Sequence, residues 1–408
     1  MKKNIIKNWK LFLLFILFLF SIVSSFLVIT TAAKYNWDYS LSLLAGQFLH
    51  KHISIAPAKV MPLGDISLYG GRFYLYFGPL PSIILMPFVL IFGKNFPQVF
   101  LGIASLMVSF FAVFSISKSF KFNRIDSLWL SVFFVFSTVL LSSALINISA
   151  YQVEVLGVPF ILLALNEYFS KKRPVLIGIL LGLAIMTRLT LILSVAFFIF
   201  EYFQKKFSLK SLLLFLIPVI IFSGVIAGYN YIRFHSFFDT GYTHSVALKS
   251  FPLSRNLDYG YMSASHIPAN LYSFLLMPPE PLLTDDKGGF VLKFPYLKAN
   301  PWGMAIWYTS PLFLFLLFKF RKSKYTLSGL LTIFLISVPI FTYFSVGFAQ
   351  FGYRYALDFL PFLFLILIPS LLPKVSKTAI FLITIGVIFN CVYITSLWGV
   401  YPVLGILK

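Results

Sequence analysis

Two pieces of segment 34–96, KYNWDYSLSLLAGQFL at 34–49 and GDISLYGGRFYLYFGPLPSIILMPF at 64–88, decide how the chain is organised. They are rich in tyrosine, and they hold two of the chain's 12 acids, Asp38 and Asp65. They follow LFLLFILFLFSIVSSFLVITT at 11–31, an apolar run of the length that a helix needs to cross a bilayer. An acidic loop directly after a first spanning helix is where a membrane enzyme would hold its first reactive groups.

The amino-acid composition indicates which class of protein this is. Of the 408 residues, 59% are hydrophobic and 11% are charged, and the mean hydropathy is +0.91. A soluble globular chain of this length does not carry such values. The single cysteine, Cys391, excludes an intramolecular disulfide framework. We therefore expect an all-α, polytopic integral membrane protein.

The apolar runs predict eleven spanning helices. A further run at 78–93, GPLPSIILMPFVLIFG, is short and holds three prolines, so we expect it to be a re-entrant or interfacial helix. The first run is longer than the apolar part of a signal peptide and is expected to be retained. The expected spans are 11–31, 98–117, 127–146, 153–169, 174–187, 189–202, 211–229, 302–318, 327–345, 357–372 and 378–396.

Lysine and arginine follow the connectors between these spans. With the N-terminus inside, short basic connectors alternate with longer external loops, and the C-terminus lies outside. This agrees with the positive-inside rule, so the formal net charge of +21 reflects topology and not a nucleic-acid partner. The basic segments assigned to the cytoplasm are 2–10, 118–124, 171–173, 205–210, 319–324 and 374–377.

Carboxylates and arginines gather on the external side. Besides Asp38 and Asp65, Glu154 lies where the third span turns into the fourth, and Arg188 lies in a hairpin between two short helices. Arg354 opens the tenth span, next to Gln350 and Tyr355 in QFGYRYALDFLPF. An arginine can hold a lipid phosphate, and a carboxylate can take a proton from an attacking hydroxyl. The combination suits a phosphorylated lipid substrate and needs no nucleotide.

The order of these motifs resembles the GT-C superfamily of membrane glycosyltransferases. That superfamily includes family 39-like protein O-mannosyltransferases, aminoarabinose transferases and bacterial lipopolysaccharide-core enzymes. NWDYSLSLLAGQFL resembles the acidic start of the first external loop, and GGRFYLYFGPLPSIILMPFVLIFG resembles the segment that closes it. AYQVEV, GILLGLAIMTRLTLIL and RYALDFLPF resemble the later acidic, hairpin and arginine elements.

The resemblance implies a sugar transfer from a polyprenyl-phosphate donor to a glycan, lipid or protein on the outer face of a prokaryotic cytoplasmic membrane. It implies that Asp38 is the base, with Glu154 assisting. Many members have a paired Asp-Glu where this chain has Asp38 and Tyr39, so Asp65 is an alternative source of the second carboxylate. The expected substrate contacts are Arg188, Arg354, Tyr355, Arg72, Tyr74 and Gln350.

The chain divides into a catalytic membrane core at 1–229, an external loop at 230–301 and C-terminal helices at 302–408. The external loop has three histidines and several acids without HxH or HExxH spacing, so we expect a lid or an acceptor site and no metal or other cofactor. We expect 285–289, DDKGG, to be a surface turn.

Each favoured residue also has a plain structural interpretation. Asp38 can cap a helix that begins near Ser40, and Arg354 can pair with Asp358 one helical turn on. Arg188 can reach lipid head groups. Two other functions stay open, an O-antigen polymerase or ligase and a membrane transporter or lipid flippase. A transporter would have charges near the middle of helices and internal repeats, and the sequence has neither.

Overall fold

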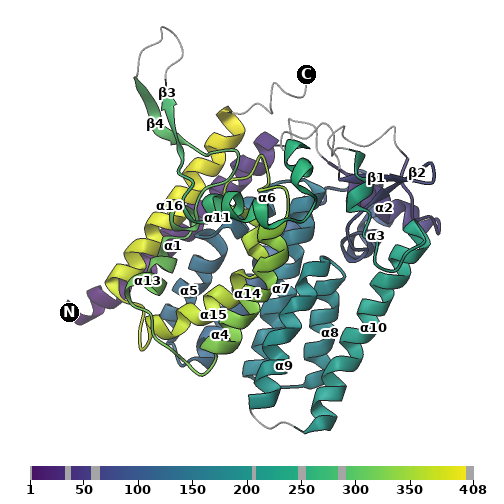
Figure 1. Cartoon of the computed structure of the whole chain (residues 1–408). Coiled ribbons are helices and arrows are strands. Elements are labelled where there is room, and N and C mark those ends of the chain that lie inside the picture. The colour runs from purple at the N-terminus through teal and green to yellow at the C-terminus, as the bar shows by residue number, and fades with distance from the viewer. Residues whose placement is uncertain are drawn as a thin grey trace.

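The protein, described here from a computed structural model, is mostly helical. The structure describes residues 2–32, 38–56, 65–204, 208–246, 254–283 and 291–400. Long helices stand side by side, and two hairpins and several short helices gather at one end (Figure 1). Within these residues, five helices are long and apolar enough to cross a membrane, so the chain is a multi-pass membrane protein. They are α1 (Lys2–Ala32), α4 (Val99–Ser119), α7 (Ser149–Phe169), α10 (Leu209–Phe234) and α16 (Lys377–Val400).

The eleven expected full spans are not found. The expected span at 127–146 is a pair of helices bent by 54°, and counting this pair as one span gives six in the described residues. The bend lies at Thr138, whose hydroxyl accepts a hydrogen bond from Leu140 N and starts a new helix. The expected span at 302–318 is three short pieces. The bent pair is α5 (Arg124–Phe136) and α6 (Val139–Leu145), and the three pieces are α12 (Ile306–Thr309), η7 (Pro311–Leu314) and α13 (Phe315–Phe318).

The other expected spans are short apolar helices of 10–17 residues or include a 3₁₀ turn. Proline sets several of their starts, since it fits the first turn of a helix, where its missing N–H costs nothing. Pro174 begins α8 and Pro361 lies in the first turn of α15. The short elements are α8 (Pro174–Ile185), η2 (Leu189–Ser194), α9 (Val195–Gln204), α14 (Thr326–Thr342) and α15 (Leu360–Leu371).

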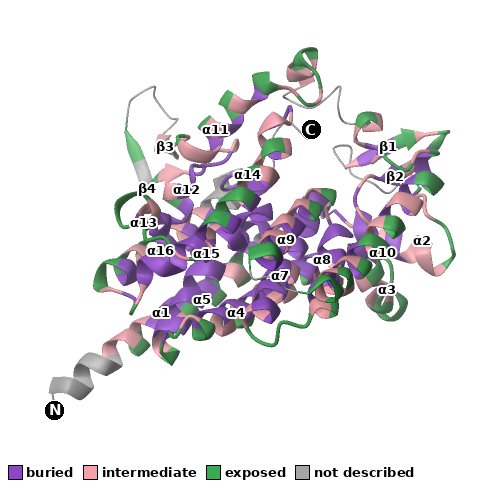
Figure 2. Cartoon of the chain, turned by 60° about the horizontal axis from the view of Figure 1, so that its bottom comes forward, coloured by how far each residue is buried: buried purple, intermediate pink, exposed green. Residues whose placement is uncertain are grey.

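One apolar core joins the first helix to the last. It runs from Leu14 on α1 to Ile394 on α16, and it is rich in phenylalanine. Buried residues concentrate around α5, α7 and α15 in Figure 2. In the most apolar window of α7 83% of the residues are buried, against 22% for α10, so α7 is a central helix and α10 presents an apolar face outward. The helices before and after the external loop thus share this core, and the three-part division at 229 and 301 stays a prediction.

The basic connectors meet at one end of the molecule. Phe120 in the connector 118–124, Phe169 just before the connector 171–173 and Tyr325 just after the connector 319–324 have ring centroids 5.0 to 6.0 Å apart. Lys10 donates a hydrogen bond to Val375 O at the start of α16 and forms an ion pair with Asp126. Because Ser24 then contacts Cys391 O further along both helices, α1 and α16 run parallel. Their N-terminal ends therefore lie on the same side.

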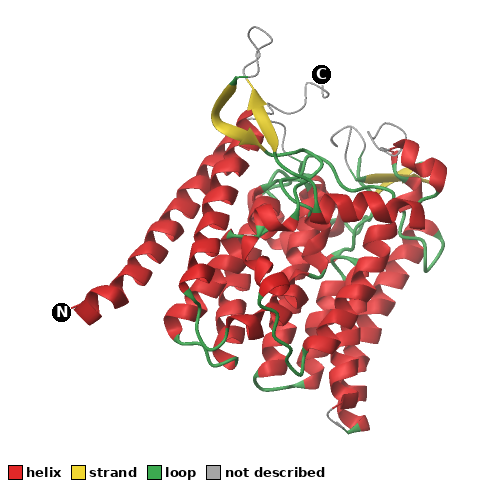
Figure 3. Cartoon of the chain, turned by 60° about the vertical axis from the view of Figure 1, so that its left-hand side comes forward, coloured by secondary structure: helices red, strands yellow, loops and turns green. Residues whose placement is uncertain are grey.

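The opposite end carries the first external loop. Here α2 (Ser40–Leu49) packs on α3 (Leu80–Phe92), and β1 (Ile66–Tyr69) pairs with β2 (Arg72–Leu75) in an antiparallel hairpin. A second hairpin, β3 (Glu280–Leu283) with β4 (Leu292–Lys298), projects beyond the helix ends (Figure 3). These hairpins depart from the expected all-α class. The remaining elements at this end are η3 (Tyr242–His244), η5 (Ser254–Tyr259), η6 (Ala264–His266) and α11 (Ile267–Leu275).

The segment expected to be re-entrant or interfacial is α3, a 13-residue helix with Pro87 inside it. Its start touches the turn after α8, where Leu80 N donates to Met186 O at 3.4 Å. A Cβ at Gly78 would collide with that same carbonyl, so only glycine permits this approach. The first external loop is thereby held beside Arg188.

Candidate active site

Three segments far apart in sequence bring two arginines onto one carboxylate. Glu154 lies in the second turn of α7, Arg188 directly precedes η2, and Arg354 opens η8 (Arg354–Asp358). Glu154 Oε1 lies 2.5 Å from Nη1 of Arg188 and 2.5 Å from Nη1 of Arg354. Glu154 is 2% exposed, so this contact is a buried one. A buried charge persists only where it is paired, and each arginine here depends on the same carboxylate.

Asp358 completes this group, which we call the arginine cluster: Glu154, Arg188, Arg354 and Asp358. The expected pair of Arg354 with Asp358 is not formed. Asp358 Oδ1 lies 3.2 Å from Nε of Arg188, and its Oδ2 accepts from the Thr190 hydroxyl at 2.6 Å. The reason is that residues 354–358 form a 3₁₀ turn, in which positions i and i+3 align and position i+4 points away.

The arginine cluster has balanced formal charge but unbalanced hydrogen bonding. Among the described residues, Glu154 Oε2 and Arg354 Nε are buried and have no hydrogen-bond partner. Buried polar atoms in folded proteins almost always have a partner, which is protein, water or ligand. The cluster is therefore built to accept a further polar group.

Two tyrosines hold the Arg354 guanidinium in place. Its carbon lies 4.6 Å from the ring centroid of Tyr151 and 4.7 Å from that of Tyr355. Arg354 Nη2 also donates to the Tyr355 hydroxyl at 3.3 Å. The Tyr151 hydroxyl donates to the carbonyl oxygens of Phe348 and Ala349, which ties the start of α7 to the segment before η8. These cation–π contacts fix the guanidinium while leaving N–H groups available.

Asp38, the expected base, uses both carboxylate oxygens and its backbone carbonyl in hydrogen bonds within the protein. Its Oδ1 accepts from Ser40 N at 2.8 Å, and its Oδ2 accepts from the N and the hydroxyl of Ser149 at 2.7 and 2.5 Å. Its carbonyl accepts from Asn147 Nδ2 at 2.9 Å. It therefore joins the first backbone amide of α2 to the start of α7. Both oxygens of this carboxylate are occupied by Ser40 and Ser149, so the plain structural interpretation of Asp38 fits its contacts.

Asp65 has a different environment. Its Oδ1 accepts a hydrogen bond from the Tyr76 hydroxyl at 2.5 Å. Burial raises the pKa of Asp65 from its ordinary value to about 6, against the opposing effects of the Tyr76 hydrogen bond and of Arg354. The charges of Asp38 and Glu154 raise the pKa further. Of the two expected candidates, Asp65 is the carboxylate suited to take a proton near neutral pH.

Tyr76 and Tyr242 were not predicted as site residues. Their ring centroids lie 4.1 Å apart, and burial raises the pKa of both hydroxyls. After burial, the charges of Arg188 and Asp65 have the largest effects on the pKa of Tyr242, Arg188 lowering it and Asp65 raising it. Tyr76 belongs to the aromatic first loop that the sequence singled out. No sequence motif distinguished Tyr242, because this residue reaches the site only through the folding of the external loop.

Three expected substrate contacts lie outside the arginine cluster. Gln350 donates to Trp302 O and Val346 O and accepts from Arg354 N, so it holds the backbone before η8. Tyr74 is buried against Phe234, with ring centroids 5.6 Å apart. Arg72 is exposed in the β1–β2 hairpin. Only Tyr355 joins the two expected arginines.

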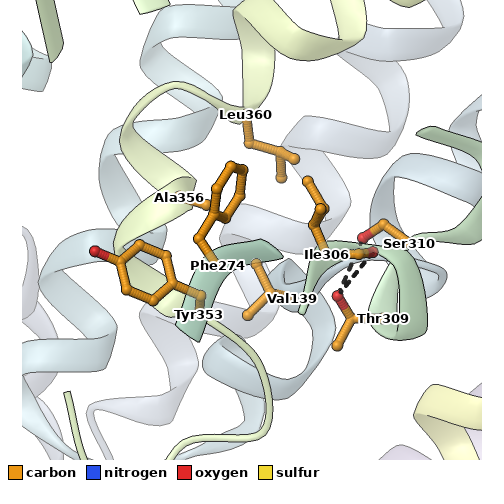
Figure 4. Close-up of a pocket in the computed structure, with 8 residues that line it drawn as sticks. All are labelled: Val139, Phe274, Ile306, Thr309, Ser310, Tyr353, Ala356 and Leu360. Atoms are coloured by element: carbon orange, nitrogen blue, oxygen red, sulfur yellow. Dashed lines mark hydrogen bonds between the residues drawn. The ribbon is translucent and has the colours of Figure 1, made fainter. Parts of the chain in front are cut away.

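Two other features of the described residues bear on this site: the metal-ligating side chains and an apolar pocket. No group of three or more His, Cys, Asp or Glu side chains able to hold a metal occurs within the described ranges. The expected turn at 285–289, and Trp37 in the first loop, lie outside those ranges. A pocket below α11 has an apolar lining that includes Val139, Phe274 and Leu360, with its only polar groups at Thr309, Ser310 and Tyr353 (Figure 4). It has none of the charges of the arginine cluster.

Comparison with known proteins gave two structural likenesses. One is the apo form of the Archaeoglobus fulgidus oligosaccharyltransferase, with a TM-score of 0.40 and 12% identity, covering 96% of this chain and 56% of that one. The other is the oligosaccharyltransferase AglB from Archaeoglobus fulgidus in complex with an inhibitory peptide and a dolichol-phosphate, with a TM-score of 0.41 and 13% identity. It covers 95% of this chain and 55% of that one. The chain thus spans about half the length of both proteins.

No protein-family model and no curated protein matched the sequence. Because the two likenesses are weak, neither the activity nor the ligands of those structures are transferred to this chain.

Proposed function

We propose that the protein is a glycosyltransferase that moves a sugar from a polyprenyl-phosphate donor to an acceptor hydroxyl at the external face of the cytoplasmic membrane. One observation carries the proposal: two arginines share one buried carboxylate, the Nε of Arg354 has no hydrogen-bond partner among the described residues, and Arg354 acts on Asp65, whose pKa is raised to about 6. The site lies at the end opposite the basic connectors. By the positive-inside rule that end is external.

The donor phosphate would bind to Arg188 and Arg354. Glu154 and Asp358 hold both guanidiniums in fixed positions, so little side-chain entropy is lost on binding. Leu189 and Ile192, next to Arg188 on η2, are 45% and 37% exposed. An apolar chain along η2 would therefore continue directly from a phosphate at Arg188. In this assignment Glu154 positions the arginines and does not act as an acid.

The transfer needs one proton acceptor and one stabilised leaving group. Asp65 takes the proton of the acceptor hydroxyl as that oxygen forms a bond to the anomeric carbon of the sugar. The bond from that carbon to the phosphate oxygen breaks, and the electron pair leaves with the lipid phosphate. Arg188 and Arg354 stabilise the charge that develops there. Asp38 holds α2 and α7 in place and takes no part in the proton transfer.

The test is sugar transfer from a radiolabelled polyprenyl-phosphate hexose in membranes that express the wild type or a variant at equal protein level. We expect Asp65→Asn to lower the rate by about 10² to 10⁴, the usual contribution of a general base. Asp258→Asn, in the exposed part of η5, is the matched control and should transfer normally. Wild-type membranes that move the labelled lipid between leaflets without transferring its sugar would replace this proposal with a lipid flippase.

A further inference from the structure

The external loop after α10 returns to the first hairpin and is fastened to it. The Ser67 hydroxyl on β1 donates to Gly241 O at 2.5 Å, and Ser67 forms an isolated antiparallel bridge with Ser245. Gly241 has φ +87°, and a Cβ there would collide with the Phe234 ring. Only glycine allows the loop to lie this close to α10 and β1.

Asp239 and His244 close this part of the loop. Asp239 Oδ1 accepts from Gly241 N at 2.8 Å, and its Oδ2 lies 2.8 Å from His244 Nε2. The His244 ring packs against Tyr69, with centroids 5.0 Å apart, and against Phe234 at 5.9 Å. The two residues therefore join the ends of a six-residue loop and fix it to the β1–β2 hairpin.

The residue presented by this loop is Tyr242. Its ring lies on the ring of Tyr76, whose hydroxyl donates to Asp65. Arg188 is the charged group with the largest effect on the Tyr242 hydroxyl, whose pKa it lowers against the effect of burial. We propose that Asp239 and His244 are positioning residues that form a clasp and hold Tyr242 as a cover over Asp65 and Arg188. This inference rests on the proposed function, because that function supplies the reactive site that Tyr242 would cover.

A cover of this kind keeps water away from the base. Burial is the largest cause of the raised pKa of Asp65, and the groups that act on this carboxyl are Tyr76, Arg354, Asp38 and Glu154. Opening the clasp would admit water, favour the ionised carboxylate and lower its pKa toward the ordinary value. The ionisable groups facing His244 are Asp239 and Tyr69. His235 packs on Tyr69 with ring centroids 6.2 Å apart, and Arg233 acts on the clasp through Asp239.

The first test measures the clasp without any sugar transfer. Ser67→Cys with Ser245→Cys places two thiols on directly opposed residues of an antiparallel bridge, a spacing that permits a disulfide. Cys391→Ser removes the native thiol. We expect mild oxidation to form the disulfide about fivefold more slowly once His244→Ala removes one hydrogen bond, whereas His244→Gln, which can still donate to Asp239, should keep the rate. Equal rates with His244 and with His244→Ala would overturn the clasp.

The second test asks whether the clasp serves the reaction. His244→Ala should lower kcat/KM for sugar transfer and move the acid limb of its pH profile down by about one unit, because water reaches Asp65. His244→Gln should restore both values. His235→Asn is the matched control, since His235 packs on the same Tyr69 at 6.2 Å and asparagine tolerates its left-handed φ of 55°. It should change neither value.

The two tests separate the possible failures. If the wild type transfers no sugar, the proposed function fails, and the disulfide rates still decide whether the clasp exists. If His244→Ala lowers kcat/KM but leaves the acid limb in place, Tyr242 does not cover Asp65 and the inference is wrong.

Discussion

The two ends of α7 carry the same residue types in opposite arrangements. Near its C-terminus, Glu167 pairs with Arg173 through two hydrogen bonds of 2.9 Å, and Arg173 is more than half exposed. Near its N-terminus, Glu154 shares one oxygen between the buried Arg354 and the partly buried Arg188, and its other oxygen has no partner among the described residues.

The Glu167–Arg173 pair uses its hydrogen-bonding groups on each other, whereas the Glu154 site leaves some of these groups without a partner among the described residues. A fork-to-fork pair uses the donors and acceptors of both groups and, at the surface, contributes little to stability. The buried arrangement leaves donors and an acceptor unused at a place where water is scarce. Residue type therefore does not distinguish the ends of α7, whereas burial and the number of partners do.

The largest expected effect comes from neutralising each glutamate in turn. Glu154→Gln leaves two buried arginines with one carboxylate fewer, which typically costs about 3–5 kcal/mol of stability, whereas Glu167→Gln should cost about 1 kcal/mol or less. Thermal unfolding in detergent, together with the transfer assay, measures both. Equal losses would mean that the two ends of α7 do not differ as described.

The next comparison replaces the arginines. Arg354→Lys keeps the charge but loses the planar fork and the contacts with two tyrosine rings, so we expect KM for the labelled donor to rise about tenfold. Arg173→Lys is the matched change at the other end and should leave KM unchanged. A rise in KM with both variants would point to a general effect on the membrane helices.

A pH profile tests the base. Because Asp65 must be ionised to accept a proton, transfer should fall as the pH drops through about 6, its pKa in the folded protein. The effect on stability has the opposite sign. The folded state binds the proton more tightly than the unfolded state, so stability should decrease as the pH rises from about 4 to 6.

Asp65→Asn should remove this pH dependence of stability, which urea unfolding at several pH values can measure. An unchanged dependence in Asp65→Asn would assign it to another group.

The smallest expected effect is that of Asp38→Asn. An asparagine can still accept some of the bonds from Ser40 and Ser149, so we expect a loss of about 1–3 kcal/mol of stability and less than a tenfold change in transfer. The measurement is the same pair of assays at matched protein level. Complete loss of transfer in a stably folded Asp38→Asn protein would restore Asp38 as the base and contradict the role given to Asp65.

Much of the architecture could be predicted from local pattern. The long apolar runs located the five spanning helices, and the basic connectors that the sequence assigned to one side do meet at one end, through Phe120, Phe169 and Tyr325. The prediction of spanning helices failed where a long apolar run was taken to be one continuous helix. Segment 302–318 is as apolar as a spanning helix but folds as three short pieces.

The candidate site shows the same limit at the level of single residues. The sequence singled out Glu154, Arg188, Arg354 and Asp65 because charged residues are rare in apolar surroundings. This rarity can be recognised from the sequence alone. The pairing of Arg188 with Asp358, the arrival of Tyr242 on Tyr76 and the use of Asp38 as a cap were decided by tertiary structure. Each depends on contacts between segments more than 100 residues apart, for which sequence spacing carries no information.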